Sequence, residues 1–248
     1  MSAASKSKLQ RFRKFTLIVS MLVFPITIYY FSPYLILMAA MRHIINGSCI
    51  VFGLMFVFGL FFGRLWCGFF CPTGGLSECF AEFSPKNPKQ GLRNFIKYGI
   101  WFVWILTVAI CHILGKGDYK IMPFFMTKHG ISVSQIGSFI IYYGIVILFL
   151  VSAIVHGKRA NCHYICWMAP FMIFSYRIGR ALHLPQLRIK TKGKNCIECK
   201  KCDNACPMSL SVSSMIKMGA IKNSECILCG ECYSACNNNV IEFKITNK

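Results

Sequence analysis

Charged residues are scarce in this sequence, and acidic residues are the scarcest of all. Asp, Glu, Lys and Arg make up only 15% of the 248 residues, while hydrophobic residues make up 55%. Long stretches of the chain carry no charge at all. A soluble core does not need such stretches, whereas one helical membrane crossing takes about 20 apolar residues. The lack of charge therefore excludes an ordinary soluble protein and predicts a helical membrane protein.

The shortage of acidic residues leaves the chain strongly basic. Eight Asp and Glu residues stand against 28 Lys and Arg residues, which gives a formal net charge of +20. The basic residues flank apolar stretches and do not form one patch, so we expect no nucleic-acid partner. We instead expect the positive charge to face anionic membrane lipid or an acidic partner protein.

The beginning of the chain lacks the features of a cleavable signal peptide. Its apolar run at 15–40 is too long for such a peptide, and no small-residue cleavage site follows it. We therefore expect a basic cytoplasmic N-terminus at 1–14 and a first transmembrane helix after it, kinked by Pro25 and Pro33.

Four transmembrane helices are expected, at 15–41, 43–64, 98–114 and 134–155. An interfacial helix is expected at 171–184. With four spans both termini lie on one side, and 24 of the 28 Lys and Arg residues lie there too. Since positively charged loops stay inside, we expect a multi-pass protein of the cytoplasmic (inner) membrane, with both termini cytoplasmic. The membrane domain spans 15–185, and a soluble domain spans 186–248.

Cysteine, by contrast, is abundant, and eight of the 15 cysteines form a repeated pattern near the C-terminus. The spacing C-x2-C-x2-C-x3-C occurs twice, as in bacterial ferredoxins, where three cysteines bind one [4Fe–4S] cluster and the fourth binds the other. We assign Cys196, Cys199, Cys202 and Cys236 to cluster 1, and Cys226, Cys229, Cys232 and Cys206 to cluster 2. A disulfide framework and zinc knuckles are the alternatives, which the doubled spacing disfavours. Iron–sulfur clusters are normally kept on the reducing side, so we expect both to be cytoplasmic.

A second cysteine motif is repeated within the predicted membrane domain. The two copies are Arg64-x2-Cys67-x3-Cys71 and Arg159-x2-Cys162-x3-Cys166. Each follows the second helix of a predicted pair, so the domain is expected to consist of two tandem hairpins related by an axis along the membrane normal. Both motifs would then lie at the cytoplasmic surface. If the backbone there is helical, C-x3-C places both sulfurs on one face, and the arginines would offset the charge of four converging thiolates.

We predict that Cys67, Cys71, Cys162 and Cys166 jointly hold a further metal centre, most simply a third iron–sulfur cluster. A structural role at helix ends, a copper site and a dithiol–disulfide pair remain as alternatives. The cysteines outside both motifs, Cys49, Cys79 and Cys111, are expected to be packing residues.

The four spans, the duplicated C-x3-C motif and the C-terminal two-cluster ferredoxin resemble the NapH type of membrane ferredoxin, which is related to the NosR and CcoG membrane iron–sulfur proteins. The first motif matches the family's C-x3-C-P pattern through Pro72. The second motif departs from this pattern, because Trp167 follows Cys166 and the proline comes later, at Pro170. The last ferredoxin cysteine, Cys236, is followed by Asn237 instead of proline. These departures indicate a diverged branch, so the nitrate-reduction role of the best-known members is not carried over.

The resemblance implies electron transfer between the quinone pool or a soluble donor and a partner redox protein. A basic ferredoxin domain also favours docking with an acidic electron carrier. The alternatives are a membrane metal (copper) reductase or maturation factor and a redox-sensing regulator. The sequence identifies no catalytic residue, and we expect an electron-transfer subunit of an oxidoreductase system. The expected fold is an α-helical membrane domain followed by an α+β ferredoxin domain.

Overall fold

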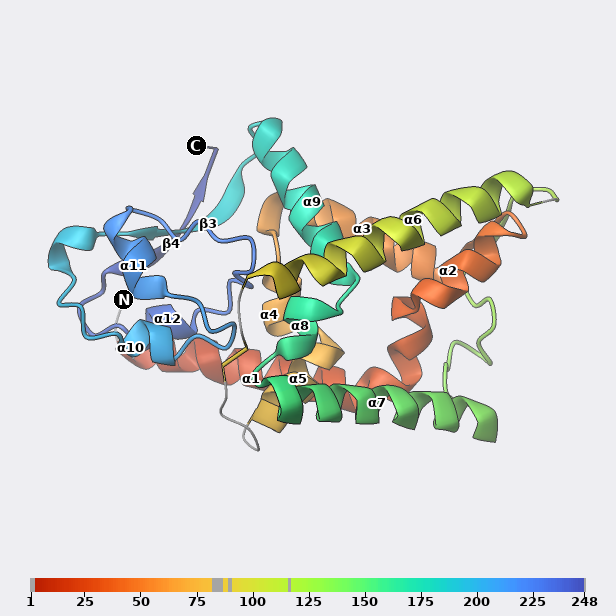
Figure 1. The fold of residues 1–248 in the computed structure, drawn as a ribbon, viewed down its shortest axis with the longest axis horizontal. Coiled ribbons are helices and arrows are strands. Elements are labelled where there is room, and N and C mark those ends of the chain that lie inside the picture. The colour runs from red at the N-terminus through yellow and green to blue at the C-terminus, as the bar shows by residue number, and fades with distance from the viewer. Residues whose placement is uncertain (1–2, 82–86, 89–90, 116, 248) are drawn as a thin grey trace.

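The structure, a computed structural model, describes residues 3–81, 87–88, 91–115 and 117–247, most of which are helical. Figure 1 shows an elongated molecule in which a bundle of long helices adjoins a smaller module of short helices and strands. Both ends of the chain lie at the module's end of the molecule.

The first apolar segment is a long helix that is broken near its end. Helix α1 (Ala3–Thr27) passes through the 3-10 turn η1 (Ile28–Phe31) into α2 (Pro33–Ala40). The expected kink at Pro33 is confirmed, because proline starts α2, where the first N–H has no helical partner to lose. The basic segment expected as a separate N-terminus is already part of α1.

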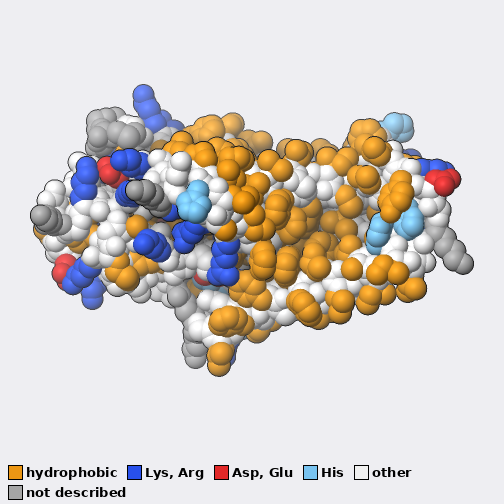
Figure 2. Space-filling model, turned by 90° about the horizontal axis from the view of Figure 1, so that it is seen from above, with side chains coloured by type: hydrophobic (Ala, Val, Ile, Leu, Met, Phe, Trp, Pro, Cys, Tyr) orange, Lys and Arg blue, Asp and Glu red, His pale blue; other side chains and the backbone are white. Residues whose placement is uncertain are grey.

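Three described stretches are long and apolar enough to cross a membrane: Ser5–Ala40, Leu92–Leu114 and Ile136–His156. The second contains η2 (Leu92–Phe95) and α6 (Ile96–Leu114), and the third is α7 (Ile136–His156). The second expected span, at 43–64, forms a shorter apolar helix, α3 (Gly47–Phe62). At about 1.5 Å per residue, α3 falls short of a hydrocarbon layer of about 30 Å. Figure 2 shows hydrophobic side chains covering the helical part, while most Lys and Arg side chains lie at the module's end.

The two repeats, each made of a long helix, a C-x3-C motif and the helix that follows it, share one order of elements. Helix α3 is followed by α4 (Leu65–Phe69) and α5 (Pro72–Ala81), and α7 is followed by α8 (Ala160–Tyr164) and α9 (Met168–Ala181). The repeats exchange their last helices, because α9 packs against α3 and α5 packs against α7. Helix α9 occupies the segment expected to be interfacial. It buries one face and exposes Phe174 and Ile178 on the other.

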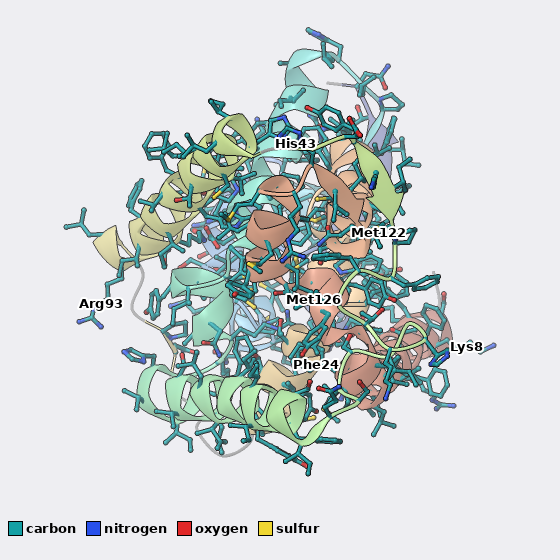
Figure 3. The ribbon with its side chains drawn as sticks, turned by 90° about the vertical axis from the view of Figure 1, so that its right-hand side faces the viewer. Lys8, Phe24, His43, Arg93, Met122 and Met126 are labelled. Carbon is teal, nitrogen blue, oxygen red and sulfur yellow. The ribbon has the colours of Figure 1, made fainter. Side chains whose placement is uncertain are left out.

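At the end farthest from the module, β1 (Ile44–Asn46) pairs in parallel with β2 (Lys120–Met122). Figure 3 looks onto this end and shows His43 and Met122 on it. The two ring nitrogens of His43 lie 3.0 Å from the carbonyl oxygens of Gly117 and His112. These contacts tie the turn after α2 to the end of α6.

The module is closed by two strands from its opposite ends. Strand β3 (Gln186–Thr191) pairs antiparallel with β4 (Ile241–Thr246). Between them lie η3 (Gly193–Asn195) and the short helices α10 (Lys201–Asn204), α11 (Val212–Lys217) and α12 (Glu231–Ala235). The small core of this module includes the fully buried Ile189, Met208 and Ile227. The module thus contains both short helices and a two-stranded sheet.

Candidate metal centres

The two ferredoxin motifs fold into loops with the same backbone shape. In each loop, the residues before and after the second cysteine have left-handed φ angles. These are 55° at Glu198 and 55° at Lys200 in the first loop, and 53° at Leu228 and 77° at Gly230 in the second. Such turns direct backbone N–H groups into the concave side of a loop, where they can bond an anion or a cluster sulfur. The local fold is therefore suited to a cluster at both motifs.

The cysteines assigned to cluster 2 line one small cavity, formed by Cys206, Cys226, Cys229 and Cys232 together with apolar side chains. Burial raises the pKa of Cys226 to about 11 and that of Cys229 to about 12. The free thiols would thus be protonated at neutral pH, and a bound metal must displace those protons. Four thiols around an apolar cavity are the ligand set of a cubane.

The cysteines assigned to cluster 1 lie nearer to the solvent. Cys202 is buried, Cys196 and Cys236 are partly buried, and Cys199 is exposed. On the side of α1, Lys6 donates a hydrogen bond of 2.6 Å to the Cys236 carbonyl oxygen. The first site therefore lies closer to the surface of the module than the second.

The two C-x3-C motifs also share a backbone conformation. The long helix before each motif ends at a glycine with a positive φ, 54° at Gly63 and 95° at Gly157. Cys71 and Cys166 each donate their backbone N–H to the carbonyl oxygen five residues earlier, at 3.1 Å and 2.9 Å. Both cysteines lie two residues beyond the last residue of the short helix. The motif is thus a short helix with a tight turn, not one continuous helix.

The four thiols of these motifs, from Cys67, Cys71, Cys162 and Cys166, converge. Each lies close enough to the other three for an electrostatic interaction. Burial raises the pKa of all four thiols above its usual value, and Arg64 opposes this rise at Cys67. The structure therefore brings together the cysteines that we predict to form a third centre.

The first C-x3-C motif packs directly on the cluster 2 loop. A Cβ atom at Gly68, inside the motif, would stand 2.5 Å from the Ile227 carbonyl oxygen and 3.4 Å from the Cys229 Cα atom. Cys67 and Cys162 belong to the same buried cluster of side chains as Cys229. The C-x3-C site and the cluster 2 site are therefore neighbours across the junction between the helices and the module.

A buried carboxylate, Glu225, links these two sites. It accepts hydrogen bonds from Arg64 at 3.0 Å and from Lys97 at 2.5 Å, and it immediately precedes Cys226. Burial alone would raise the pKa of Glu225, but Arg64 and Lys97 outweigh burial and hold this pKa below its usual value. Burial lowers the pKa of the adjacent His163 to about 4, so this imidazole is neutral.

A second ion network joins α1 to the same junction. One oxygen of Glu78 accepts hydrogen bonds from Arg13 at 2.7 Å and from Arg159 at 2.5 Å. Arg13 also reaches Glu231 on α12 at 2.5 Å, and Arg159 donates to the Cys67 carbonyl oxygen at 2.9 Å. The network therefore connects α1, α5, α8 and α12.

Sequence reasoning places the two motif arginines beside the cysteines but does not find their carboxylate partners. It also places the start of the third span at residue 98, whereas Lys97 already lies in the first turn of α6 with 0% of its side chain exposed. Lys86 and Lys89, two of the basic residues counted on the cytoplasmic side, lie outside the described residues. A usable signal was the rarity of acidic residues, because four of the eight, Glu78, Glu198, Glu225 and Glu231, stand directly before a cysteine.

Within the described parts of the chain, no group of three or more His, Cys, Asp or Glu side chains is arranged to hold a single metal ion. The thiolates of a cubane bind different iron atoms and stand farther apart than the ligands of one ion. Cys49 and Cys111, outside both motifs, are partly buried on α3 and α6.

Comparisons with known families support iron–sulfur chemistry at both kinds of motif. A family described as "4Fe-4S binding domain" matches residues 47–90 and 139–185, which contain the two C-x3-C motifs. A family described as "4Fe-4S dicluster domain" matches residues 195–241. The chain therefore has ferredoxin-type domains that bind iron–sulfur clusters, with two [4Fe–4S] clusters supported.

Several known proteins are similar over most of this chain. MJ0750 and MJ0749 of Methanocaldococcus jannaschii, both described as uncharacterized, are 26% and 24% identical to it over 77% and 75% of its length, and over 76% and 66% of their own. A protein of Escherichia coli named "Putative electron transport protein YccM" is 22% identical over 71% of this chain and 50% of its own length. No solved structure matches the chain.

Proposed function

We propose that this protein is an integral-membrane electron relay in which cluster 1, cluster 2 and a third cluster at the C-x3-C cysteines form one line from the module's surface to the membrane. The observation that carries the proposal is the packing of Gly68 on the cluster 2 loop. It sets the C-x3-C thiols beside cluster 2, and Cys199 of cluster 1 is exposed. Clusters exchange single electrons without bond chemistry, so the work of the chain is to position them and to tune their potentials.

A third cluster would suit the chemistry of the C-x3-C site. Four thiolates complete the ligand set of a cubane, and a buried cluster with its thiolates carries about −2 when oxidised. Arg64 and Arg159 are 3% and 1% exposed and lie among these thiols. Buried cations of this kind would offset a charge that is otherwise costly near hydrocarbon.

The position of the junction suggests the two ends of the relay. The exposed cluster 1 would exchange electrons with a soluble carrier or a partner redox protein, and the basic surface favours an acidic one. The C-x3-C site lies where the apolar helices begin, so quinone is the proposed partner on the membrane side. If α3 is counted as a span, the chain crosses the membrane four times, and an even number of crossings puts both termini on one side. Both termini do lie at the module's end of the molecule. The positive-inside rule then places this end in the cytoplasm.

The test is the iron and acid-labile sulfide content of protein prepared without oxygen. Two clusters give about eight irons per chain, and a third gives about twelve. The double variant Cys67→Ser/Cys162→Ser should fall from about twelve to about eight irons per chain, with both ferredoxin signals kept in paramagnetic resonance. Cys111→Ser, outside both motifs, is the matched control and should change nothing. About eight irons in the unaltered protein would leave only two clusters, and copper at these cysteines would instead favour a metal reductase.

A further inference from the structure

A basic cavity lies between α9 and the ferredoxin module. Its volume is about 930 Å³, which is within the range of small-molecule sites. Tyr176 and Ile173 of α9 form part of its apolar wall, and Met218 and Leu228 of the module form another part. The cavity is thus shared between the helical part and the module.

The charged residues of the cavity wall all carry positive charge. Six of the lining residues are Lys or Arg: Arg64, Arg177, Arg180, Arg188, Lys190 and Lys222. The wall also includes His183. None of the residues that line the cavity is Asp or Glu. Five of the six cations, all but Arg64, have no ion pair among the described residues. Figure 2 shows Lys and Arg side chains gathered where the module meets the hydrophobic surface.

Two of these cations have buried side-chain nitrogens. Arg64 is only 3% exposed and lies beside the Cys67 thiol, with which its side chain interacts. The Nε atom of Arg188 is buried without a hydrogen-bond partner in the described chain. Unpaired buried donors are costly, and guanidinium groups match the oxygens of phosphate with paired N–H donors. The wall therefore has both the charge and a free donor that an anion would use.

The same wall includes Cys226, which we assign to cluster 2, and Ser224 and Leu228 on either side of it. A ligand in the cavity would therefore lie beside cluster 2. The cavity also adjoins α9, whose Phe174 and Ile178 are exposed.

We propose that this cavity binds an anionic, phosphate-bearing ligand whose apolar part rests on Tyr176 and Leu228. Two sources share this chemistry: the headgroup of an anionic phospholipid, which reaches the cavity along α9, and a soluble phosphate ester. This proposal does not depend on the electron relay proposed above, because the cavity would bind its ligand even if the C-x3-C cysteines hold no cluster.

The first arm of the test uses a soluble phosphate ester. The holoprotein in detergent is titrated with adenosine monophosphate and with adenosine, which differ only in the phosphate, and binding is followed by calorimetry. The variant Arg177→Gln/Arg180→Gln removes two exposed cations of the cavity. Lys8→Gln/Lys244→Gln removes two exposed cations outside it and serves as the control. If the ligand is soluble, adenosine monophosphate binds about tenfold or more tightly than adenosine, and only the cavity variant loses this preference.

The second arm uses lipid. The same three proteins are placed in nanodiscs of phosphatidylglycerol or phosphatidylcholine, and native mass spectrometry counts the lipids retained on release. If the ligand is a phospholipid headgroup, the unaltered and control proteins retain phosphatidylglycerol in preference, and the cavity variant does not. Iron content and the thermal melting temperature confirm that all variants are folded.

Either preference, abolished only by the cavity variant, supports the proposal and identifies the source. The proposal is overturned if neither anion is preferred, or if the control variant loses the preference as completely as the cavity variant does.

Discussion

At the scale of single residues, the contact between the helices and the module depends on positions where an added atom would clash or where a lost charge would leave a buried ion unpaired. Gly68 is such a position, because a Cβ atom would stand 2.5 Å from the Ile227 carbonyl oxygen, which belongs to the backbone of the cluster 2 loop. Gly53 on α3 is a matched contrast, since nothing lies within 4 Å of its Cβ position.

Gly68→Ala should therefore displace the module from the helices. We expect a loss of about 1–3 kcal/mol of stability, as for overpacked cores, and an altered resonance signal from cluster 2. Gly53→Ala should be neutral or stabilising, because alanine favours a helix interior by up to about 1 kcal/mol over glycine. Thermal unfolding followed by circular dichroism measures both. Equal melting temperatures for the two variants would show that the close contact at Gly68 is unimportant.

Glu225 allows a second comparison at this scale. It holds two cations, Arg64 and Lys97, that are 3% and 0% exposed, so Glu225→Gln leaves both without a counter-charge. Breaking a buried ion pair in this way costs about 3–5 kcal/mol. Glu242→Gln, which breaks an exposed pair with Lys192, should cost at most about 1 kcal/mol. Chemical denaturation of the two variants in one detergent compares them, and similar losses would contradict the importance of the buried network.

At the scale of elements, the repeats are held together by exchange of their last helices. The contact between α3 and α9 is close at Gly59, where a Cβ atom would stand 2.0 Å from the Ser175 Oγ atom and 3.3 Å from its Cβ atom. Ser175 is fully buried, with 0% of its surface exposed. The fit between the two repeats at this point therefore depends on one hydroxyl group facing one glycine.

Gly59→Ala should separate α3 from α9 and lower the melting temperature. Ser175→Ala in the same chain removes the opposing oxygen, so the double variant should recover most of the loss. Overpacking of this kind costs about 1–3 kcal/mol, and a double-mutant cycle on thermal unfolding measures the coupling. Additive losses would mean that these helices do not meet at this point.

The elements that sequence reasoning predicts are those with a local cause. The two ferredoxin loops follow from cysteine spacing, the break at Pro33 follows from proline chemistry, and the tandem repeat follows from the recurring R-x2-C-x3-C motif. The exchange of α5 and α9 between the repeats has no local signal. The ion pair between Lys97 and Glu225 has no local signal either, because these residues are 128 positions apart in the chain and meet only in the folded protein.

At the scale of the whole molecule, the distribution of basic residues and the positions of the two termini are consistent with the same topology. Both termini and the ferredoxin module lie at one end, the C-x3-C motifs lie where the module meets the helices, and β1 and β2 pair at the other end. Helix α3 is the weakest of the expected spans, since it has only 16 residues. It is flanked by other helices, however, and a span enclosed by protein can tolerate a mismatch that a lone helix would relieve by tilting or by thinning the bilayer.

The proposed orientation is tested by labelling single introduced cysteines in intact cells. Lys8 lies on the exposed side of α1 near the module, and Lys120 lies in β2 at the opposite end. A membrane-impermeant thiol reagent should label Lys120→Cys in intact cells and should label Lys8→Cys only after the membrane is opened. Lys244→Cys, on the exposed surface of the module, provides an internal control, because its labelling should follow that of Lys8→Cys. The reverse labelling pattern would show that the protein has the opposite orientation in the membrane. Labelling of both positions in intact cells would mean that α3 does not cross, since the two ends of the molecule would then share one side.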